Sequence, residues 1–177
     1  SKLLTKGYSV AVAEQVGVVG AAKGPVERQI VRILTPGTIV ESNLLPARQN
    51  NYLVSICRGD LVLDPISGNK EYIWGLAAVA SACGEFLLTE LSQSKLLLEL
   101  SRLSPSELLV AKRTARSPEG FPSEELLLPK EAESRYRISG RPSMFFQSEP
   151  AKRRLQQYFQ VSTLEGFGCA QMPQAIG

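Results

Sequence analysis

A polar stretch interrupted by proline divides this sequence into two units of unequal length. Pro36-Gly37 ends a strand-like run, because proline removes a backbone donor from a sheet and glycine supplies the freedom that a turn needs. The segment that follows, 38–50, is largely polar and contains Pro46, so we interpret it as a linker. The sequence therefore predicts one unit over 1–37 and a second over 51–177.

The first unit has the pattern of a short helix followed by two strands. Ser1–Lys6 is expected to end an amphipathic helix, with Gly7 in the left-handed position that follows it. Tyr8–Glu14 alternates as a strand does, and Arg28–Thr35 is a second strand-like run. The glycine-rich connection 15–25 leads into a strand rather than a helix, which excludes a dinucleotide-binding fingerprint.

The second unit opens with three short strands. Strand-like runs occupy Tyr52–Arg58, Tyr72–Ala80 and Glu85–Glu90. Turn signals separate these runs, one set in the segment 60–70 and another at Cys83-Gly84. Three antiparallel strands joined in this way form a meander.

A helix and a further strand follow the meander. Ser92–Ser101 carries an apolar stripe and opens on a serine that can cap a helix. Glu107–Ala111 is a short apolar strand, so the strand–helix–strand order predicts a crossover that pairs it with the meander. We interpret the charged, proline-containing stretch Lys112–Glu133 as a surface connection. Together these patterns predict a mixed α/β fold.

A second helix is expected near the end of the chain, over Pro150–Gln160. Pro150 suits the first helical position, where a backbone N–H is not needed. The residues of this helix expected to face the core are Leu155, Tyr158 and Phe159. The remaining residues, 161–177, show no clear element.

The absence of histidine from the 177 residues removes several kinds of chemistry. Ser-His-Asp and Cys-His catalysis, and zinc sites that use imidazole, all require a residue that this sequence lacks. Cys57, Cys83 and Cys169 are scattered, which favours buried thiols in a reducing compartment over a disulfide framework. No apolar run approaches the roughly 20 residues of a membrane span, and no secretory signal opens the sequence. We therefore expect no membrane partner.

Two groups of basic side chains are candidate binding residues, although the net charge is only +3. The first group lies on the glycine-rich loop and the strand after it: Lys23, Arg28 and Arg32. These cations suit DNA phosphates, or they are ordinary surface charges. The second group is a run on the last helix: Lys152, Arg153 and Arg154. That run fits an acidic partner, a DNA-facing patch or a solvated helix face.

Carboxylates in or beside the meander raise the alternative of a nuclease: Asp60, Asp64, Glu71, Glu85 and Glu90. A ribonuclease-H-type nuclease gathers its carboxylates around two metal ions about 4 Å apart. The expected turn positions of Asp60 and Asp64 do not suit such a cluster, so surface charge is the favoured interpretation. We assign no catalytic residue and no metal site. Trp74 is expected in the core, with base stacking as the alternative.

Three blocks of this sequence match one protein family in order and spacing. The first is Lys23–Thr38 (KGPVERQIVRILTPGT), preceded by Ser9–Gln15 (SVAVAEQ). The second is Leu44–Asn51 (LLPARQNN), and the third is Ala151–Gly168 (AKRRLQQYFQVSTLEGFG), a helix followed by Leu-x-Gly-Phe-Gly. These blocks resemble the end of the mismatch-binding domain, the entry to the connector domain and the connector helix of the MutS family of DNA mismatch-repair proteins.

The resemblance implies a fold and a function. Residues 1–37 would be the C-terminal part of a small mixed α/β domain, and 51–177 a ribonuclease-H-like connector domain, without catalysis, that continues past Gly177. Full-length family proteins are homodimers that bind mismatched duplex DNA, use ATP and Mg²⁺ in a separate domain, and recruit MutL. The connector relays between the mismatch and the ATPase domain. The resemblance implies no cofactor within this fragment itself.

The resemblance also implies roles for the two basic groups. Lys23, Arg28 and Arg32 would lie on the DNA side, and the helix around Lys152 on the MutL side. Family members can carry a glutamine pair at the helix positions linked to MutL binding, where this sequence has Arg153 and Arg154. Gln156-Gln157 is shifted from those positions.

The family pattern leaves alternatives open. The mismatch-reading Phe-x-Glu of the family is expected ahead of Ser1, and the ATPase segments beyond Gly177. A bacterial cytoplasm is the expected compartment, with an organelle as the alternative. The functional alternatives are a ribonuclease-H-like metal-dependent nuclease and an interaction module of a MutS paralogue that does not act in mismatch repair.

Overall fold

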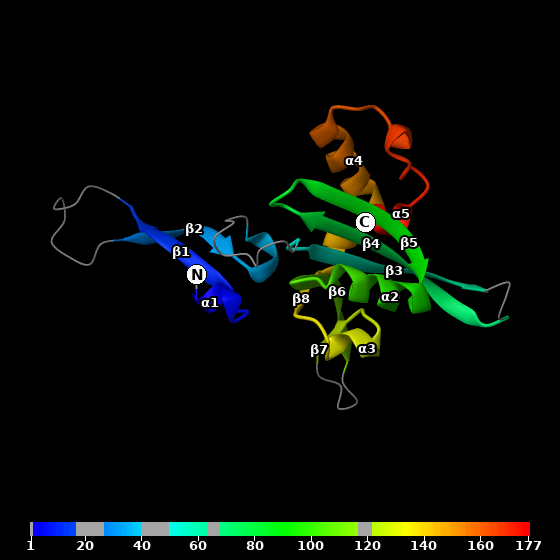
Figure 1. The fold of residues 1–177 in the computed structure, drawn as a ribbon, viewed down its shortest axis with the longest axis horizontal. Coiled ribbons are helices and arrows are strands. Elements are labelled where there is room, and N and C mark those ends of the chain that lie inside the picture. The colour runs from blue at the N-terminus through cyan, green and yellow to red at the C-terminus, as the bar shows by residue number, and fades with distance from the viewer. Residues whose placement is uncertain (1, 17–26, 40–49, 64–67, 117–121) are drawn as a thin grey trace.

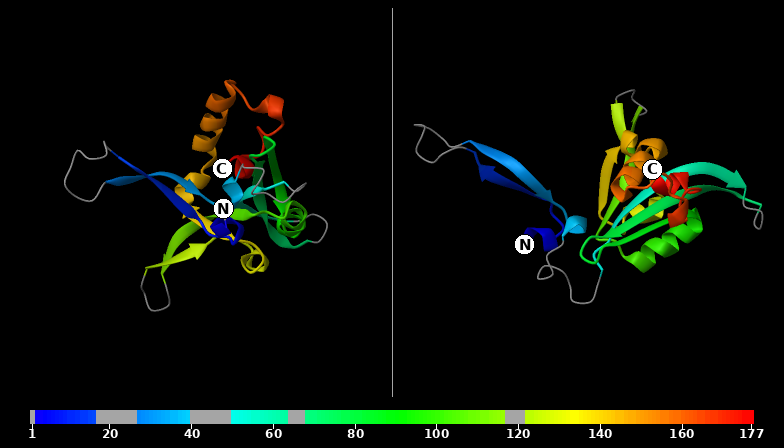
Figure 2. Two further views of the ribbon diagram at one scale, coloured as in Figure 1. Left: turned by 60° about the vertical axis from the view of Figure 1, so that its left-hand side comes forward. Right: turned by 90° about the horizontal axis from the view of Figure 1, so that it is seen from above.

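The computed structural model describes residues 2–16, 27–39, 50–63, 68–116 and 122–177, which form two separate sheets. A two-stranded ribbon comes from the N-terminal residues, and a six-stranded mixed sheet with helices on both faces comes from the rest. Figure 1 shows the ribbon projecting from the larger body, and Figure 2 shows the same separation from two further directions. The prediction of a mixed α/β fold is confirmed.

The chain begins with one helical turn, α1 (Lys2–Thr5), which ends where the sequence predicts. Gly7 is left-handed, with φ of 85°, and its N–H donates to the carbonyl oxygen of Leu4. Leu4 is buried and Leu3 is exposed, so the turn has one apolar side.

Strands β1 (Val10–Gln15) and β2 (Arg28–Leu34) pair antiparallel and are called the hairpin below. Almost every described residue of the hairpin is exposed, which includes the apolar side chains of Ile30, Val31 and Ile33. The part of the chain that the structure describes therefore leaves both faces of the hairpin uncovered. A two-stranded ribbon has little stability by itself, so its attachment to the larger sheet matters.

The larger sheet opens with the predicted meander of β3 (Leu53–Leu63), β4 (Lys70–Ala80) and β5 (Glu85–Ser92). Gly84, with φ of 72°, supplies the left-handed turn before β5. The strand predicted to end at Arg58 continues to Leu63, so the expected turn position of Asp60 is wrong, while Asp64 and Pro65 lie outside the described residues. A bulge between Arg58 and Leu61 takes up Gly59-Asp60, after which β3 resumes its ladder with β4.

The predicted crossover consists of α2 (Gln93–Leu103) and β6 (Glu107–Arg116). β6 lies parallel to β3, with Leu53 opposite Glu107 at the start of both strands. Ser104 ends α2 in a left-handed conformation, with φ of 46°. The larger unit thus has a meander followed by a helix and a strand parallel to β3, and the predicted crossover is confirmed.

Much of the stretch predicted to be a surface connection is regular structure instead. β6 continues to Arg116 and pairs antiparallel with β7 (Pro122–Leu126), and α3 (Lys130–Glu133) follows. Ion pairs of 2.7 Å join Lys112 to Glu124 and Arg113 to Glu125 across the two strands. The prediction for Lys112–Glu133 is therefore wrong, because charges typical of a loop here match one another across an exposed strand pair. A further strand, β8 (Ile138–Pro142), lies parallel to β6.

The face of the sheet opposite α2 carries α4 (Ser148–Phe159) and α5 (Pro173–Ile176), with the 3-10 turns η3 (Ser143–Phe146) and η4 (Glu165–Phe167) nearby. α4 begins at Ser148, so Pro150 is its third residue rather than its first. Leu155 faces inward as predicted. Tyr158 is 80% exposed and Phe159 is 37% exposed, so the prediction that they face the core is wrong; α4 packs through Ala151 and Leu155 instead.

The two faces of the sheet bury different apolar clusters. The larger cluster lies between α2 and the sheet and includes Ile56, Trp74, Leu76, Leu96, Leu100 and Leu108. The smaller one lies under α4 and α5 and is centred on Leu164, Cys169 and Ile176. Trp74 is only 2% exposed, so its predicted place in the core is confirmed and base stacking is excluded.

α5 rests directly on the backbone of β4 at Gly75. A Cβ atom placed on Gly75 would lie 2.0 Å from the carbonyl carbon and oxygen of Gln174. Oε1 of Glu90, on β5, accepts hydrogen bonds from the N–H groups of Gln174 at 2.7 Å and Ala175 at 3.4 Å. Only glycine permits this close seating of α5.

Replacement of Gly75 by alanine should therefore destabilise the sheet face that carries α5. We expect Gly75→Ala to lower the free energy of unfolding by about 2 kcal/mol and the melting temperature by roughly 4–8 °C. Gly166→Ala is the matched control, because a Cβ atom at Gly166 would meet no atom within 4 Å. Thermal unfolding followed by circular dichroism measures both variants; equal melting temperatures would contradict the account.

Candidate functional site

The hairpin is fastened to the larger sheet by a buried carboxylate. Glu107, at the start of β6, is 1% exposed. Its Oε2 accepts a hydrogen bond from the backbone N–H of Gly37 at 3.2 Å, and its Oε1 accepts one from the hydroxyl of Ser139 at 2.6 Å. The 3-10 turn η1 (Pro36–Thr38), which ends the first unit, is thereby joined to β6 and β8 at once.

A buried amide completes this junction. Nδ2 of Asn51 donates to the carbonyl oxygens of Pro36 at 2.9 Å and Ile39 at 3.4 Å. Its Oδ1 accepts a hydrogen bond from the hydroxyl of Ser106. We call Asn51, Ser106, Glu107 and Ser139, together with the turn 36–39 that they hold, the clasp.

The clasp requires a close approach of backbone to side chain. A Cβ atom on Gly37 would lie 2.8 Å from Cδ1 of Leu53 and 2.9 Å from Cβ of Glu107. A second contact between the units is peripheral: Nη2 of Arg137 donates to Oγ of Ser9 at 3.4 Å. The glycine thus lets the turn lie against the first residues of β3 and β6.

Two of the three basic residues assigned to DNA lie on the hairpin. Arg28 and Arg32 are both on β2 and both exposed. Lys23 falls outside the described residues. Two cations on an uncovered strand are free to approach an anionic surface.

The basic run assigned to a partner lies on α4. Arg153 and Arg154 are exposed, and Lys152 is half-buried. In the described ranges, none of the three takes part in an ion pair. Arg154 also borders an apolar depression between α4, β5 and α5.

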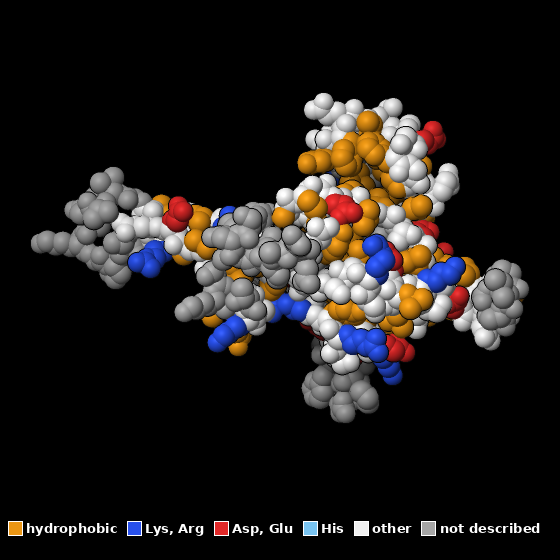
Figure 3. All heavy atoms as spheres, in the orientation of Figure 1, with side chains coloured by type: hydrophobic (Ala, Val, Ile, Leu, Met, Phe, Trp, Pro, Cys, Tyr) orange, Lys and Arg blue, Asp and Glu red, His pale blue; other side chains and the backbone are white. Residues whose placement is uncertain are grey.

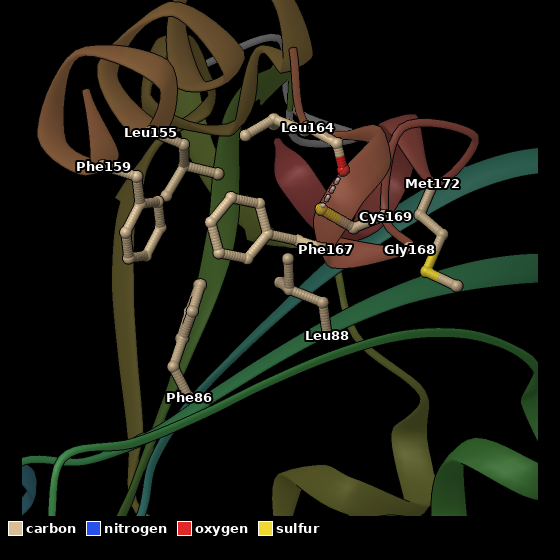
Figure 4. A pocket seen from close by; sticks show the side chains of 9 residues that line it. All are labelled: Phe86, Leu88, Leu155, Phe159, Leu164, Phe167, Gly168, Cys169 and Met172. Carbon is tan, nitrogen blue, oxygen red and sulfur yellow. Dashed lines mark hydrogen bonds between the residues drawn. The ribbon is translucent and has the colours of Figure 1, made fainter. Parts of the chain in front are cut away.

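Beside this run the structure has an apolar hollow of about 190 Å³. Its lining comes from β5, α4 and the segment around η4: Phe86, Leu88, Leu155, Phe159, Leu164, Phe167, Gly168, Cys169 and Met172. Figure 4 shows the rings of Phe86, Phe159 and Phe167 turned toward the same space.

The carboxylates considered for a nuclease are dispersed. Asp60 lies in the bulge of β3, and Glu90 is engaged with the start of α5. Glu85 accepts a hydrogen bond of 2.6 Å from the hydroxyl of Tyr52, and this bond raises the pKa of Tyr52 above its usual value of 10.0. Asp64 falls outside the described residues. Among the residues that are described, no three of His, Cys, Asp or Glu are grouped as a metal site would need.

The cysteines are free thiols in three different environments. Cys169 is buried and Cys57 is half-buried, and burial raises the pKa of the Cys57 thiol. Cys83 is exposed, so the prediction of buried thiols is wrong for this residue, which lies in the turn before β5.

Comparison with known proteins identifies both parts of the chain. The family model for MutS domain II matches residues 51–177, and the model for MutS domain I matches residues 1–43. The chain belongs to the MutS family. DNA mismatch repair protein MutS from Dehalococcoides mccartyi (strain CBDB1) is 37% identical over 176 residues, which is 99% of this chain and 18% of that protein. The MutS proteins of Thermosynechococcus vestitus and of a Synechococcus strain are each 36% identical, over 98% and 99% of this chain.

The chain spans about a fifth of the length of these curated MutS relatives, with shares of 18%, 19% and 20%. Residues 1–43 match family domain I and residues 51–177 match family domain II, so the resemblance to the MutS family is confirmed. No described helix is long and apolar enough to cross a membrane.

Neither the clasp nor the apolar hollow was predicted from the sequence. The available signal for the clasp was Glu107, which begins the apolar strand ELLVA. A carboxylate in a buried strand is rarely found without hydrogen-bond partners, so its position predicts that donors lie nearby. The hollow has no comparable signal, since its walls come from three distant segments of the chain.

Removal of the Glu107 carboxylate should loosen the clasp. Glu107→Ala leaves the Gly37 N–H and the Ser139 hydroxyl without their acceptor, so we expect the free energy of unfolding to fall by about 3 kcal/mol. Urea unfolding measures the loss, and amide hydrogen exchange at Gly37 should become faster. Glu131→Ala, at an exposed position of α3, is the control. Unchanged exchange at Gly37 would show that Glu107 does not hold the turn.

Proposed function

We propose that this chain is a binding and relay part of a DNA mismatch-repair protein of the MutS family. Family membership supports this proposal, and the clasp is the structural observation that carries the relay. The turn after the basic strand β2 is hydrogen-bonded to Glu107 on β6 and to Asn51 just ahead of β3, and α4 packs on β5 of the same sheet. A displacement of the hairpin is therefore passed to the sheet through these hydrogen bonds, and from the sheet to α4 through side-chain packing.

The proposal divides the chain as its sequence suggests. Residues 1–37 act as the C-terminal part of the mismatch-binding domain, 38–50 as a linker and 51–177 as the connector domain. Lys23, Arg28 and Arg32 face DNA phosphates, and Lys152, Arg153 and Arg154 face MutL. The full-length protein is a homodimer that binds mismatched duplex DNA and works in the bacterial cytoplasm.

The proposal places no bond-breaking step in this fragment. ATP and Mg²⁺ are cofactors of the full-length protein and bind in another of its domains. The dispersal of the described carboxylates gives no support to a ribonuclease-H-like nuclease. The presence of Phe-x-Glu in the mismatch-binding domain of the full-length protein would distinguish this proposal from a MutS paralogue outside mismatch repair.

Binding of the DNA-side residues should depend strongly on salt. Each phosphate contact releases counterions, so log K for duplex binding falls against log salt with a slope of about −0.9 per contact. In the full-length protein, we expect Arg28→Ala with Arg32→Ala to make this slope shallower by about 2, measured by fluorescence anisotropy with a mismatched duplex. Lys130→Ala with Arg135→Ala, at exposed positions near α3, should leave the slope unchanged. Equal slopes in both double variants would contradict the DNA-side assignment.

Recruitment of MutL should depend on the basic run of α4. Reversing charge at Arg153 and Arg154 replaces attraction for an acidic surface by repulsion, so we expect Arg153→Glu with Arg154→Glu to lower MutL recovery at least tenfold. Pull-down of MutL by the full-length protein measures the effect. Lys130→Glu with Arg135→Glu is the control of equal charge change. Undiminished recovery by the α4 variant would reject this helix as the contact.

A further inference from the structure

The apolar hollow is large enough for one bulky side chain of another molecule. An apolar cavity of about 150 Å³ holds a benzene ring, and this hollow measures about 190 Å³. Its floor is buried, with Leu164 and Cys169 at 1% and 6% exposure. Its rim is open, and Phe86, Phe159 and Phe167 expose between 37% and 53% of their surfaces. Apolar side chains gather where α4 stands above β5 (Figure 3).

A second depression adjoins the first. It measures about 200 Å³ and shares the walls formed by Phe86, Leu88 and Leu155. Its border carries Arg154, whose guanidinium has no ion-pair partner among the described residues. The two depressions together make one continuous apolar surface with a cation at its edge.

The aromatic rim is ordered by contacts among its own rings. The ring of Phe159 lies 4.9 Å from that of Phe167 and 5.2 Å, edge to face, from that of Tyr158. Tyr158 follows Arg154 by one helical turn, so the two lie on the same side of α4. Tyrosine, phenylalanine, methionine and arginine around a desolvated centre are typical of the residues that dominate binding energy in protein interfaces.

Charge indicates the character of the occupant. α4 carries Lys152, Arg153 and Arg154 against one carboxylate, Glu149, and η4 adds Glu165. The surplus of positive charge lies on the helix that forms one wall of the hollow. A purely apolar partner would leave these cations unmatched, whereas a partner with carboxylates next to its apolar residue would match both features.

We propose that the hollow receives an aromatic or large aliphatic side chain from a partner segment whose neighbouring residues are acidic and lie against Arg154, the cation at its border. This inference deepens the proposed function and rests on it, because the partner segment belongs to the protein that α4 recruits. The hollow supplies the anchor and the basic run supplies orientation and attraction at longer range.

The test uses the full-length protein and purified MutL. We expect Phe167→Ala and Phe86→Ala each to weaken MutL binding at least tenfold in biolayer interferometry, with melting temperatures close to that of the unchanged protein. Phe145→Ala is the matched control, because Phe145 is 54% exposed, as Phe167 is 53% exposed, but lies on η3 outside the hollow. If Phe145→Ala weakened MutL binding as much as Phe167→Ala and Phe86→Ala do, the proposal would be overturned.

A photo-crosslinking arm identifies the occupant. With p-benzoylphenylalanine at position 167 of the full-length protein, we expect a crosslink to a MutL segment that has an apolar residue flanked by Asp or Glu. A crosslink to a second copy, or to another segment of the same chain, would overturn the proposal.

The two proposals fail in different ways. Unchanged MutL affinity in Phe86→Ala and Phe167→Ala, together with loss in the Arg153 and Arg154 reversal, would reject the hollow and leave recruitment by α4 standing. Unchanged affinity in the reversal, or no MutL binding by the unaltered protein, would reject the recruitment itself.

Discussion

A carboxylate buried where two parallel strands begin holds the two parts of this molecule together. No described cation forms an ion pair with Glu107; its carboxylate accepts hydrogen bonds from a backbone N–H of the turn at Gly37 and from the hydroxyl of Ser139. A buried carboxylate is tolerated only when donors surround it, so the turn and β8 must both be in place for β6 to begin as it does. The uncovered hairpin has little stability of its own, and the hydrogen bonds of Glu107 hold the turn that connects it to the larger sheet.

The fold could be predicted from the sequence where patterns are local. The meander, the crossover helix and the strand ELLVA follow from alternation, from turn residues and from an apolar stripe, and all appear in the structure. The prediction was wrong for Lys112–Glu133, because charged residues and prolines are typical of loops but here belong largely to strands β6 and β7. In β6 and β7, lysine and arginine face glutamate across the strands, and this pairing is invisible until the register is known. The bulge that carries β3 past Asp60 is hidden for the same reason.

The candidate sites also differ in whether the sequence alone could reveal them. The exposed cations of β2 and α4 could be found from the sequence, because a basic run is read directly and the family blocks give it a context. The clasp and the hollow could not, since each is assembled from residues far apart in the chain. Glu107 meets Gly37 across 70 positions, and the wall of the hollow joins β5 to residues beyond 150. Such sites are properties of the packed sheet rather than of any segment.

The register of the central strands has a mechanical consequence. Leu53 and Glu107 are opposite each other at the same end of β3 and β6, and the turn at Gly37 rests on both. A pulling force on the hairpin therefore acts along β3 and β6 from one end. The hydrogen bonds between these two strands would then be loaded together, in shear, instead of opening one after another. Such an attachment is stiff along the strands, and it makes the central pair of the sheet the tension-bearing element of the molecule.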